Sequence, residues 1–194
     1  MAGPAAPSAP AAAARQSLVR QDLSLLLKLS GPVVLARLGI MTMGLMDAIV
    51  VGRFSAEQLG FHALAWAPTS VVLTMAIGLL AGVQVMTARA VGEGRPHESG
   101  AVLRRGLVYG TWIGLASMAV LALLGPVGLA NMGLEDSLAK GAAWPVVVFA
   151  LSLPTYVIAC AASFWLEGLS RPVPAMVIMW LANAVNLAFL LVLV

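Results

Sequence analysis

The stretch LGIMTMGLMDAIVV, from Leu38 to Val51, decides the fold, because it places the carboxylate of Asp47 in an otherwise largely apolar run. A carboxylate among aliphatic and methionine side chains is costly in lipid, so it normally faces the interior of a helix bundle. There it binds a proton, an ion or a cationic partner. The stretch therefore predicts a membrane helix that carries a charged site, and it points to transport.

The composition of the chain excludes a soluble globular domain. Of its 194 residues 61% are hydrophobic and 10% are charged, and the mean hydropathy is +0.97. Runs long enough to cross about 30 Å of hydrocarbon occur about five times. We therefore expect an all-α, polytopic helix bundle in the lipid bilayer, with spans at about 23–51, 61–91, 102–124, 142–166 and 173–194.

The lysine and arginine residues fall mostly on one side of these spans. One side has Arg53 and Lys140, whereas the other has Arg15, Arg20, Lys28, Arg89, Arg95, Arg104, Arg105 and Arg171. By the positive-inside rule, this asymmetry predicts a cytoplasmic amino terminus and a multi-pass protein of the plasma membrane, such as the bacterial inner membrane. The sequence pI of 9.6 and the formal charge of +3 follow from the same bias, so they require no nucleic-acid partner.

The amino-terminal segment MAGPAAPSAPAAAA, residues 1–14, is a low-complexity Ala/Pro sequence with little apolar surface to bury. Segments of this composition do not fold by themselves. We therefore expect residues 1–21 to be a disordered cytoplasmic tail and residues 22–194 to form the helix bundle.

The sequence has no pattern that indicates an enzyme. The two histidines, His62 and His97, lack metal-ligand spacing, and no Ser/His constellation or paired intramembrane aspartate occurs. The chain therefore predicts neither catalysis nor a metal or cofactor.

Glycine recurs at every fourth position in two of the spans. Gly106, Gly110 and Gly114 form one such ridge, and Gly78 and Gly82 form the other. Small residues at this spacing let neighbouring helices approach closely, so both ridges predict helix contacts.

Three amide side chains lie in the second and fifth spans. Asn183 and Asn186 are three positions apart and so share a helix face, while Gln84 adds a polar group to the second span. For Asn183 and Gln84 we favour hydrogen bonding between helices over a direct role in transport.

Arg37 is a second charged residue in the first span. It precedes Asp47 by ten positions, which separates the two by ~15 Å along the helix axis and prevents a direct pair. Two interpretations stay open: Arg37 snorkels to the membrane interface, or it points into a water-filled cavity. Hydroxyl side chains that are able to line the same cavity are expected to bond their own backbone; they are Thr42, Thr69, Ser70, Thr74 and Thr87.

Six stretches, taken in order, resemble the multidrug and toxic compound extrusion (MATE) family. They begin with MGLMDAIVVGR (43–53), which is similar to the end of the family's first helix, and cover nearly all of the chain from Leu25 onward. The others are AEQLG (56–60), IGLLAGVQVMTARAVGEGR (77–95), LRRGL (103–107), FWLEGLSRPVPAM (164–176) and NAVNLAFLLVLV (183–194).

The resemblance implies an antiporter that expels cationic or amphipathic organic compounds and is driven by a proton or sodium gradient. In this family an acidic residue on the first helix and an Asn on the fifth take part in ion binding, and these positions correspond to Asp47 and Asn186. Some relatives carry a second Asp four residues after that Asn, where this chain has Leu190. Asp47 is thus the main candidate for coupling to H⁺ or Na⁺, with Arg37, Asn183 and Gln84 as further cavity candidates.

The length of the chain allows only part of such a transporter. The family fold has about twelve helices in two bundles, which require roughly 240 residues at ~20 per span. We therefore expect this chain to supply most of one six-helix half, as a fragment that needs a second helix bundle. Two alternatives stay open: a lipid or polysaccharide flippase of the same superfamily, which favours an Arg-rich cavity, and a structural membrane subunit that does not transport.

Overall fold

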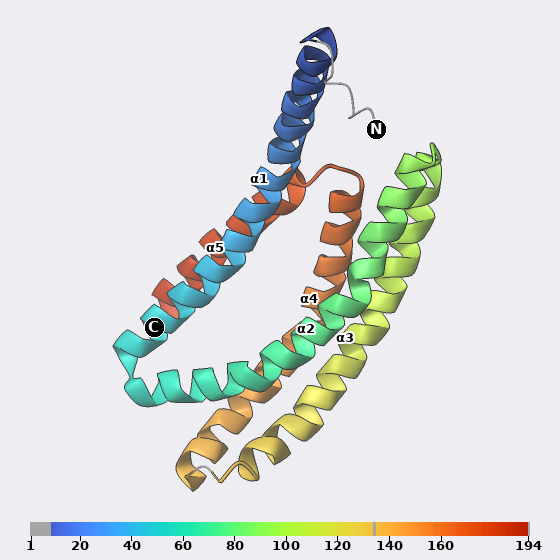
Figure 1. Ribbon diagram of the computed structural model, residues 1–194. Helices are drawn as coiled ribbons and strands as arrows, with labels where there is room; N and C mark the ends of the chain where they lie inside the picture. Colours follow the sequence, from blue (N-terminus) through green and yellow to red (C-terminus); the bar gives the residue numbers. More distant parts are fainter. Residues whose placement is uncertain (1–8, 134, 194) are drawn as a thin grey trace, which may run out of the picture.

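Five long helices make up the computed structural model, which describes residues 9–133 and 135–193 (Figure 1). Each of the five is long and apolar enough to cross a membrane, with a mean hydropathy of 1.8 to 2.1 in its most apolar part. This arrangement confirms the all-α, polytopic prediction. The elements are α1 (Ala9–Phe54), α2 (Ala56–Gly92), the short 3-10 turn η1 (Pro96–Glu98), α3 (Ser99–Ala130), α4 (Asp136–Gly168) and α5 (Val173–Leu193).

The connections between the helices are short and lie at two ends of the molecule. At the end that we call the basic end, residues 93–98 join α2 to α3 and residues 169–172 join α4 to α5. At the opposite end, Ser55 alone separates α1 from α2, and its hydroxyl accepts a hydrogen bond from the backbone N–H of Gln58 at 3.4 Å. A serine in this position caps an orphan N–H of the new helix, which explains why α2 begins there.

The amino-terminal part of α1 differs from our expectation. The helix begins at Ala9, so residues 9–21 are helical where the sequence led us to expect a disordered tail. Alanine has the highest helix propensity of all residues, and this segment runs without a break into an apolar helix that supports it. Residues 1–8 of the expected tail lie outside the described residues.

The core of the molecule lies between α2, α3 and α4, which we call the three-helix unit. Two clusters of buried side chains fill it: one is centred on Leu121, Val146 and Leu153, and the other on Leu80 and Val157. At the basic end, the indole N–H of Trp165 in α4 donates to the carbonyl of Ser99 in α3 at 2.9 Å. Apolar packing and this hydrogen bond make the unit continuous from end to end.

The glycine ridge of α3 is a region of close packing within the three-helix unit. A methyl group on Gly114 would lie 2.6 Å from the Cα of Pro154 in α4, and one on Gly106 would lie 2.8 Å from a methyl of Val83 in α2. The predicted close approach along Gly106, Gly110 and Gly114 is therefore confirmed. The prediction for Gly78 and Gly82 is wrong, because no other helix comes within 4 Å of a methyl group placed on either residue.

The other two helices, α1 and α5, lie side by side and form what we call the α1–α5 pair (Figure 1). They meet at Gly39, where an added methyl group would lie 3.0 Å from the Cγ of Met179. α5 scarcely touches α4, and α1 contacts the three-helix unit chiefly through α2. The fold thus consists of a well-packed unit of three helices and a pair that is joined to it more loosely.

Candidate functional site

Asp47 lies in the half of α1 that is closer to Ser55, and its carboxylate is only partly accessible. Its Oδ1 atom is buried and has no hydrogen-bond partner. Among the described residues, it is the one buried side-chain oxygen or nitrogen that lacks a partner. A buried polar atom without a partner costs about 1–3 kcal/mol, and more where the group is charged. An unsatisfied buried oxygen in a native protein calls for an explanation, such as a functional role or a bound water or ion.

Asn186 does not satisfy Asp47 in this structure. It is half-buried on the face of α5 that also carries Asn183, but its amide makes no hydrogen bond with any described residue. Asn183 donates from Nδ2 to the carbonyl of Met179 at 2.9 Å, which is a bond within its own helix. The expected hydrogen bond from Asn183 to a neighbouring helix is therefore wrong.

The registry of α1 against α5 places Asn186 short of the level of Asp47. A methyl group on Gly39 would contact both Met179 and Asn183, so Gly39 lies at a level between these two residues. With a rise of ~1.5 Å per residue, Asp47 lies about 12 Å beyond Gly39, and Asn186 falls about 1.5 to 7.5 Å short of that level. Because α1 and α5 run in the same direction, the residues of α5 at the level of Asp47 fall within 187–191, all of which are apolar.

Gln84 lies near the basic end of α2 and is half-buried. Its backbone carbonyl would lie 2.8 Å from a methyl group on Gly168, so α4 passes very close to this point. The side-chain amide, however, makes no hydrogen bond with another helix within the described part of the chain. The expectation of an interhelical bond from Gln84 is therefore not met, and its contribution to the structure is close backbone packing.

Arg37 pairs with a residue that we did not consider. Its Nη2 lies 3.6 Å from Oε1 of Glu167 in α4, and its Cζ lies 5.8 Å from the centre of the Phe164 ring. The Glu167 side chain is 8% exposed and that of Arg37 is 45% exposed. Arg37 therefore bridges α1 to the three-helix unit through Glu167.

A signal for Glu167 was present in the sequence. It stands in FWLEGLSRPVPAM, three residues after an aromatic residue and within an apolar helix. Intramembrane carboxylates are functional candidates by default, and the argument that singled out Asp47 applies equally here. Our expected fourth span ended at residue 166, one residue before Glu167, so we missed the carboxylate.

The hydroxyl side chains behave as we expected. Each donates to a backbone carbonyl of its own helix, three or four residues earlier, at 2.7 to 2.8 Å. These bonds satisfy the hydroxyls without a ligand. The residues are Thr42, Thr69, Ser70, Thr74 and Thr87.

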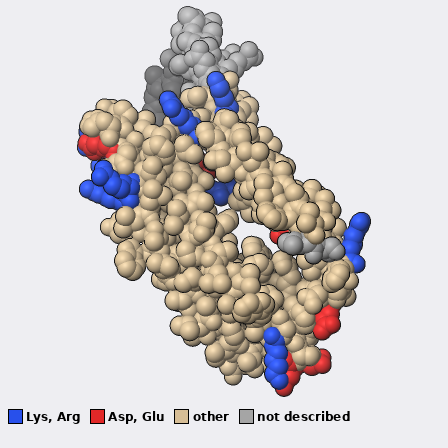
Figure 2. Space-filling view, turned by 180° about the vertical axis from the view of Figure 1, so that it is seen from behind, with Lys and Arg blue, Asp and Glu red and all other residues tan. Residues whose placement is uncertain are grey.

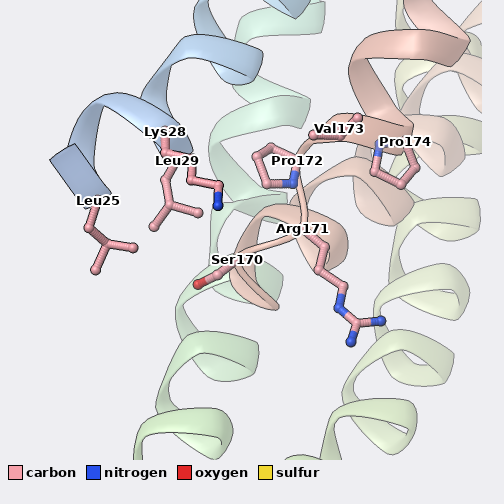
Figure 3. Close-up of a pocket in the computed structure, with 8 residues that line it drawn as sticks. All are labelled: Leu25, Lys28, Leu29, Ser170, Arg171, Pro172, Val173 and Pro174. Carbon is pink, nitrogen blue, oxygen red and sulfur yellow. The ribbon is translucent and has the colours of Figure 1, made fainter.

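A cavity of about 570 Å³ lies at the basic end, between α1 and the α4–α5 connection (Figure 3). Its lining includes Lys28 and Arg171, but Figure 3 shows the guanidinium of Arg171 directed away from the ammonium of Lys28. The two cations do not converge on one point. The remaining lining is mostly apolar: Leu25, Leu29, Pro172, Val173 and Pro174, with Ser170.

The α2–α3 connection carries a compact group of surface ion pairs. Arg89 donates to Glu93 at 2.7 Å, and Arg95 pairs with both Glu93 and Glu98. Hydrogen bonds from Arg89, and then from Arg95, hold the pKa of the Glu93 carboxyl below its ordinary value. Part of the basic charge at this end is therefore neutralised locally, and exposed arginines such as Arg105 keep the remainder.

A membrane helix bundle with a buried, partnerless carboxylate oxygen in its first helix is typical of membrane transporters. Comparison with known proteins gives the family. The chain matches the MatE family over residues 32–192, and it belongs to this family of multidrug and toxic compound extrusion transporters. Members of the family are transporters rather than enzymes, in agreement with the absence of a catalytic pattern in the sequence.

Similar curated proteins carry multidrug resistance names. The chain is 65% identical over 176 residues to a probable multidrug resistance protein NorM of Caulobacter vibrioides. The matched region covers 91% of this chain and 37% of that protein. It is 26% identical to the multidrug resistance protein NorM of Vibrio cholerae, over 87% of this chain and 36% of that one. The chain therefore spans little more than a third of the length of these relatives.

A solved structure shows the same fold. A transporter of the MOP superfamily from Pyrococcus furiosus superposes with a TM-score of 0.76 at 20% identity, covering 84% of this chain and 36% of that one. At this identity the likeness extends to the fold alone. It agrees with the prediction of a bundle that corresponds to most of one half of such a transporter.

Proposed function

We propose that this chain supplies one helix bundle of a cation-coupled antiporter that exports cationic or amphipathic organic compounds across the plasma membrane. The observation that carries the proposal is the buried Oδ1 of Asp47, which has no hydrogen-bond partner. Membership of the MATE family and the multidrug resistance names of the relatives support the export of organic compounds. The second bundle is part of the proposal, since the matched part of this chain covers only 37% of the relative's length.

The coupling ion is a proton or a sodium ion at Asp47. Protonation neutralises the carboxylate and gives it a hydrogen-bond donor, which removes the cost of a buried charge. Sodium has the same effect on the charge and takes oxygen ligands, which the backbone carbonyls of α1 and α5 and the amide oxygen of Asn186 are able to supply. In either case, the ion and the substrate compete for one negative charge, so a bound ion favours release of an organic cation.

The pairing of Arg37 argues against the flippase alternative. A cavity for an anionic lipid or polysaccharide carrier needs unneutralised basic side chains. Arg37 was the strongest basic candidate in the spans, and Glu167 already neutralises it. The net charge of this part of the interior is therefore unsuited to an anion.

The basic end is proposed to face the cytoplasm, so that α1 runs outward. Most of the described lysine and arginine residues lie toward this end, among them Lys28, Arg89, Arg95, Arg104, Arg105 and Arg171. Labelling in intact cells tests the orientation with His97→Cys, which is exposed in η1, in a Cys160→Ser background. We expect a membrane-impermeant thiol reagent to react only after the membrane is opened, and ready labelling in intact cells would reverse the assignment.

The central test of the proposed function is Asp47→Asn in the complete transporter. Asparagine is nearly isosteric and uncharged, so the protein is expected to fold and insert at wild-type levels. Gradient-driven efflux of a cationic dye from vesicles should fall to the level of empty vesicles, because the amide neither releases a proton nor carries the charge that binds sodium. Imposing a proton gradient and then a sodium gradient on the wild type identifies the ion.

The matched control for this test is Asp136→Asn. The Asp136 side chain is 93% exposed in the first turn of α4 and forms a surface ion pair with Lys140, so the same chemical change there should leave efflux unaltered. Wild-type efflux from Asp47→Asn would remove Asp47 from the coupling mechanism. Absence of gradient-driven efflux from the wild type would favour the structural subunit.

A further inference from the structure

The ion pair between Arg37 and Glu167 is unequal in burial. Glu167 is 8% exposed at the end of α4, whereas Arg37, 3.6 Å away, is 45% exposed. A buried carboxylate requires a cation beside it, because an uncompensated buried charge is strongly destabilising. The half-exposed guanidinium, by contrast, is able to return to water at little cost. The carboxylate is the fixed member of the pair and the cation is the exchangeable one.

The surroundings of Glu167 suit organic cations in general. The ring of Phe164, one turn away on the same helix, lies 5.8 Å from the guanidinium carbon of Arg37. A carboxylate next to an aromatic face is the arrangement that binds quaternary and delocalised cations, through charge and through the electron-rich face of the ring. Arg37 therefore occupies a cation site that is built by α4.

The position of the pair gives its exchange a structural consequence. Among the described residues it is the one ion pair that joins two membrane-spanning helices, and α1 has few other contacts with α4. In the space-filling view an opening passes through the middle of the molecule, with basic and acidic atoms beside it (Figure 2). Release of Arg37 would leave the α1–α5 pair attached to the three-helix unit mainly at Ser55 and at residues 169–172.

We propose that Glu167 is a binding carboxylate for organic cation substrates, and that Arg37 is a built-in competitor which the substrate displaces. The inference rests on the proposed export function and adds a second carboxylate, about 15 Å from the level of Asp47 along α1. The substrate enters at the basic end, takes the place of Arg37 beside Glu167 and Phe164, and so frees α1 from α4. Substrate binding at this carboxylate and loosening of the α1–α5 pair are then one event.

The test is equilibrium binding of tetraphenylphosphonium to the full chain in lipid nanodiscs, without any ion gradient. Arg37→Gln removes the competitor and should tighten binding roughly tenfold, within the range typical of coupling between two ligands. Glu167→Gln should weaken binding roughly tenfold, because the fixed charge is lost. In the Glu167→Gln background, Arg37→Gln should not change the tetraphenylphosphonium affinity further, because no carboxylate remains for Arg37 to occupy.

Two control variants account for the change in overall charge. Arg105→Gln removes an exposed arginine from α3 at the same end, and Glu57→Gln removes an exposed carboxylate from the first turn of α2. Neither should change the affinity by more than the error of the measurement. If Arg37→Gln fails to fold, Arg37→Lys takes its place, and it should still tighten binding because an ammonium lacks the planar stacking of guanidinium.

A purely structural ion pair gives a different pattern. Arg37→Gln and Glu167→Gln would then lower the thermal stability of the chain by similar amounts and leave tetraphenylphosphonium affinity unchanged, which overturns the proposal. Absence of binding by Arg37→Gln overturns it as well. Neither result bears on the export function, which is decided separately by gradient-driven efflux and Asp47→Asn.

Discussion

The three-helix unit and the α1–α5 pair are both apolar, but they are packed very differently. In the most apolar part of α4, 28% of residues are buried within the described structure, whereas the value is 6% for α1 and zero for α5. The mean hydropathies of the three helices are almost the same, from 1.8 to 2.1. Hydropathy therefore identifies what is able to enter the membrane and does not indicate which helices pack tightly.

The candidate functional residues are concentrated on the less tightly packed region. The α1–α5 pair carries Asp47, Arg37, Asn183 and Asn186. The three-helix unit contributes Glu167, which pairs with Arg37. Elements that move during function come from the weakly held parts of a protein, while rigid parts provide a fixed reference. We infer that the three-helix unit is the fixed reference and that the pair moves against it.

The largest effect should follow a change inside the three-helix unit. A methyl group on Gly114 would lie 2.6 Å from the Cα of Pro154, and backbone atoms are unable to yield as a side chain does. We expect Gly114→Ala to lower the free energy of unfolding by about 1–3 kcal/mol, the range for overpacking, despite the better helix propensity of alanine. Thermal unfolding of the purified chain in detergent measures the loss.

The control for that change is Gly78→Ala on the open ridge of α2. No atom of another helix lies within 4 Å of the added methyl group, so the substitution should be neutral or should stabilise the helix by up to ~1 kcal/mol. Equal losses from Gly114→Ala and Gly78→Ala would mean that the three-helix unit is not the tightly packed region. The comparison between the two regions would then fail.

The outcome for the glycine ridges illustrates what sequence pattern is able to predict. Spans, their order and the α3 ridge followed from apolar runs and from small residues at every fourth position. The same spacing occurs in Gly78 and Gly82, but no other helix within the described residues lies within 4 Å of a methyl group placed there. Small residues permit close approach but do not supply the neighbour, so the partner of a ridge depends on tertiary geometry that a local pattern does not contain.

The polar residues illustrate the same limit for the candidate site. A charged residue in an apolar span is visible in the sequence, and this criterion identified Asp47 and Arg37. Partners depend on registry between helices: Asn183 bonds its own helix, and Arg37 pairs with a carboxylate 130 positions later. A change of one turn, about 5.4 Å, is enough to exchange one partner for another, and hydropathy is insensitive to such a shift.

The smallest effect should follow a change within the α1–α5 pair. A methyl group on Gly39 would lie 3.0 Å from the Cγ of Met179 and 3.4 Å from the Nδ2 of Asn183, which are both side-chain atoms. Methionine is unbranched and flexible, so it is able to move aside at little cost, and alanine improves the helix propensity of α1. We expect Gly39→Ala to change the free energy of unfolding by less than ~1 kcal/mol.

The decisive comparison is between Gly39→Ala and Gly114→Ala under identical conditions. A smaller loss at Gly39 is expected if the pair adapts to a change of spacing while the three-helix unit does not. Thermal unfolding of both variants, measured with Gly78→Ala as the neutral reference, gives the ranking. A loss at Gly39 as large as that at Gly114 would show that α1 and α5 are held as rigidly as the core, and the inference that the pair moves against the three-helix unit would then fail.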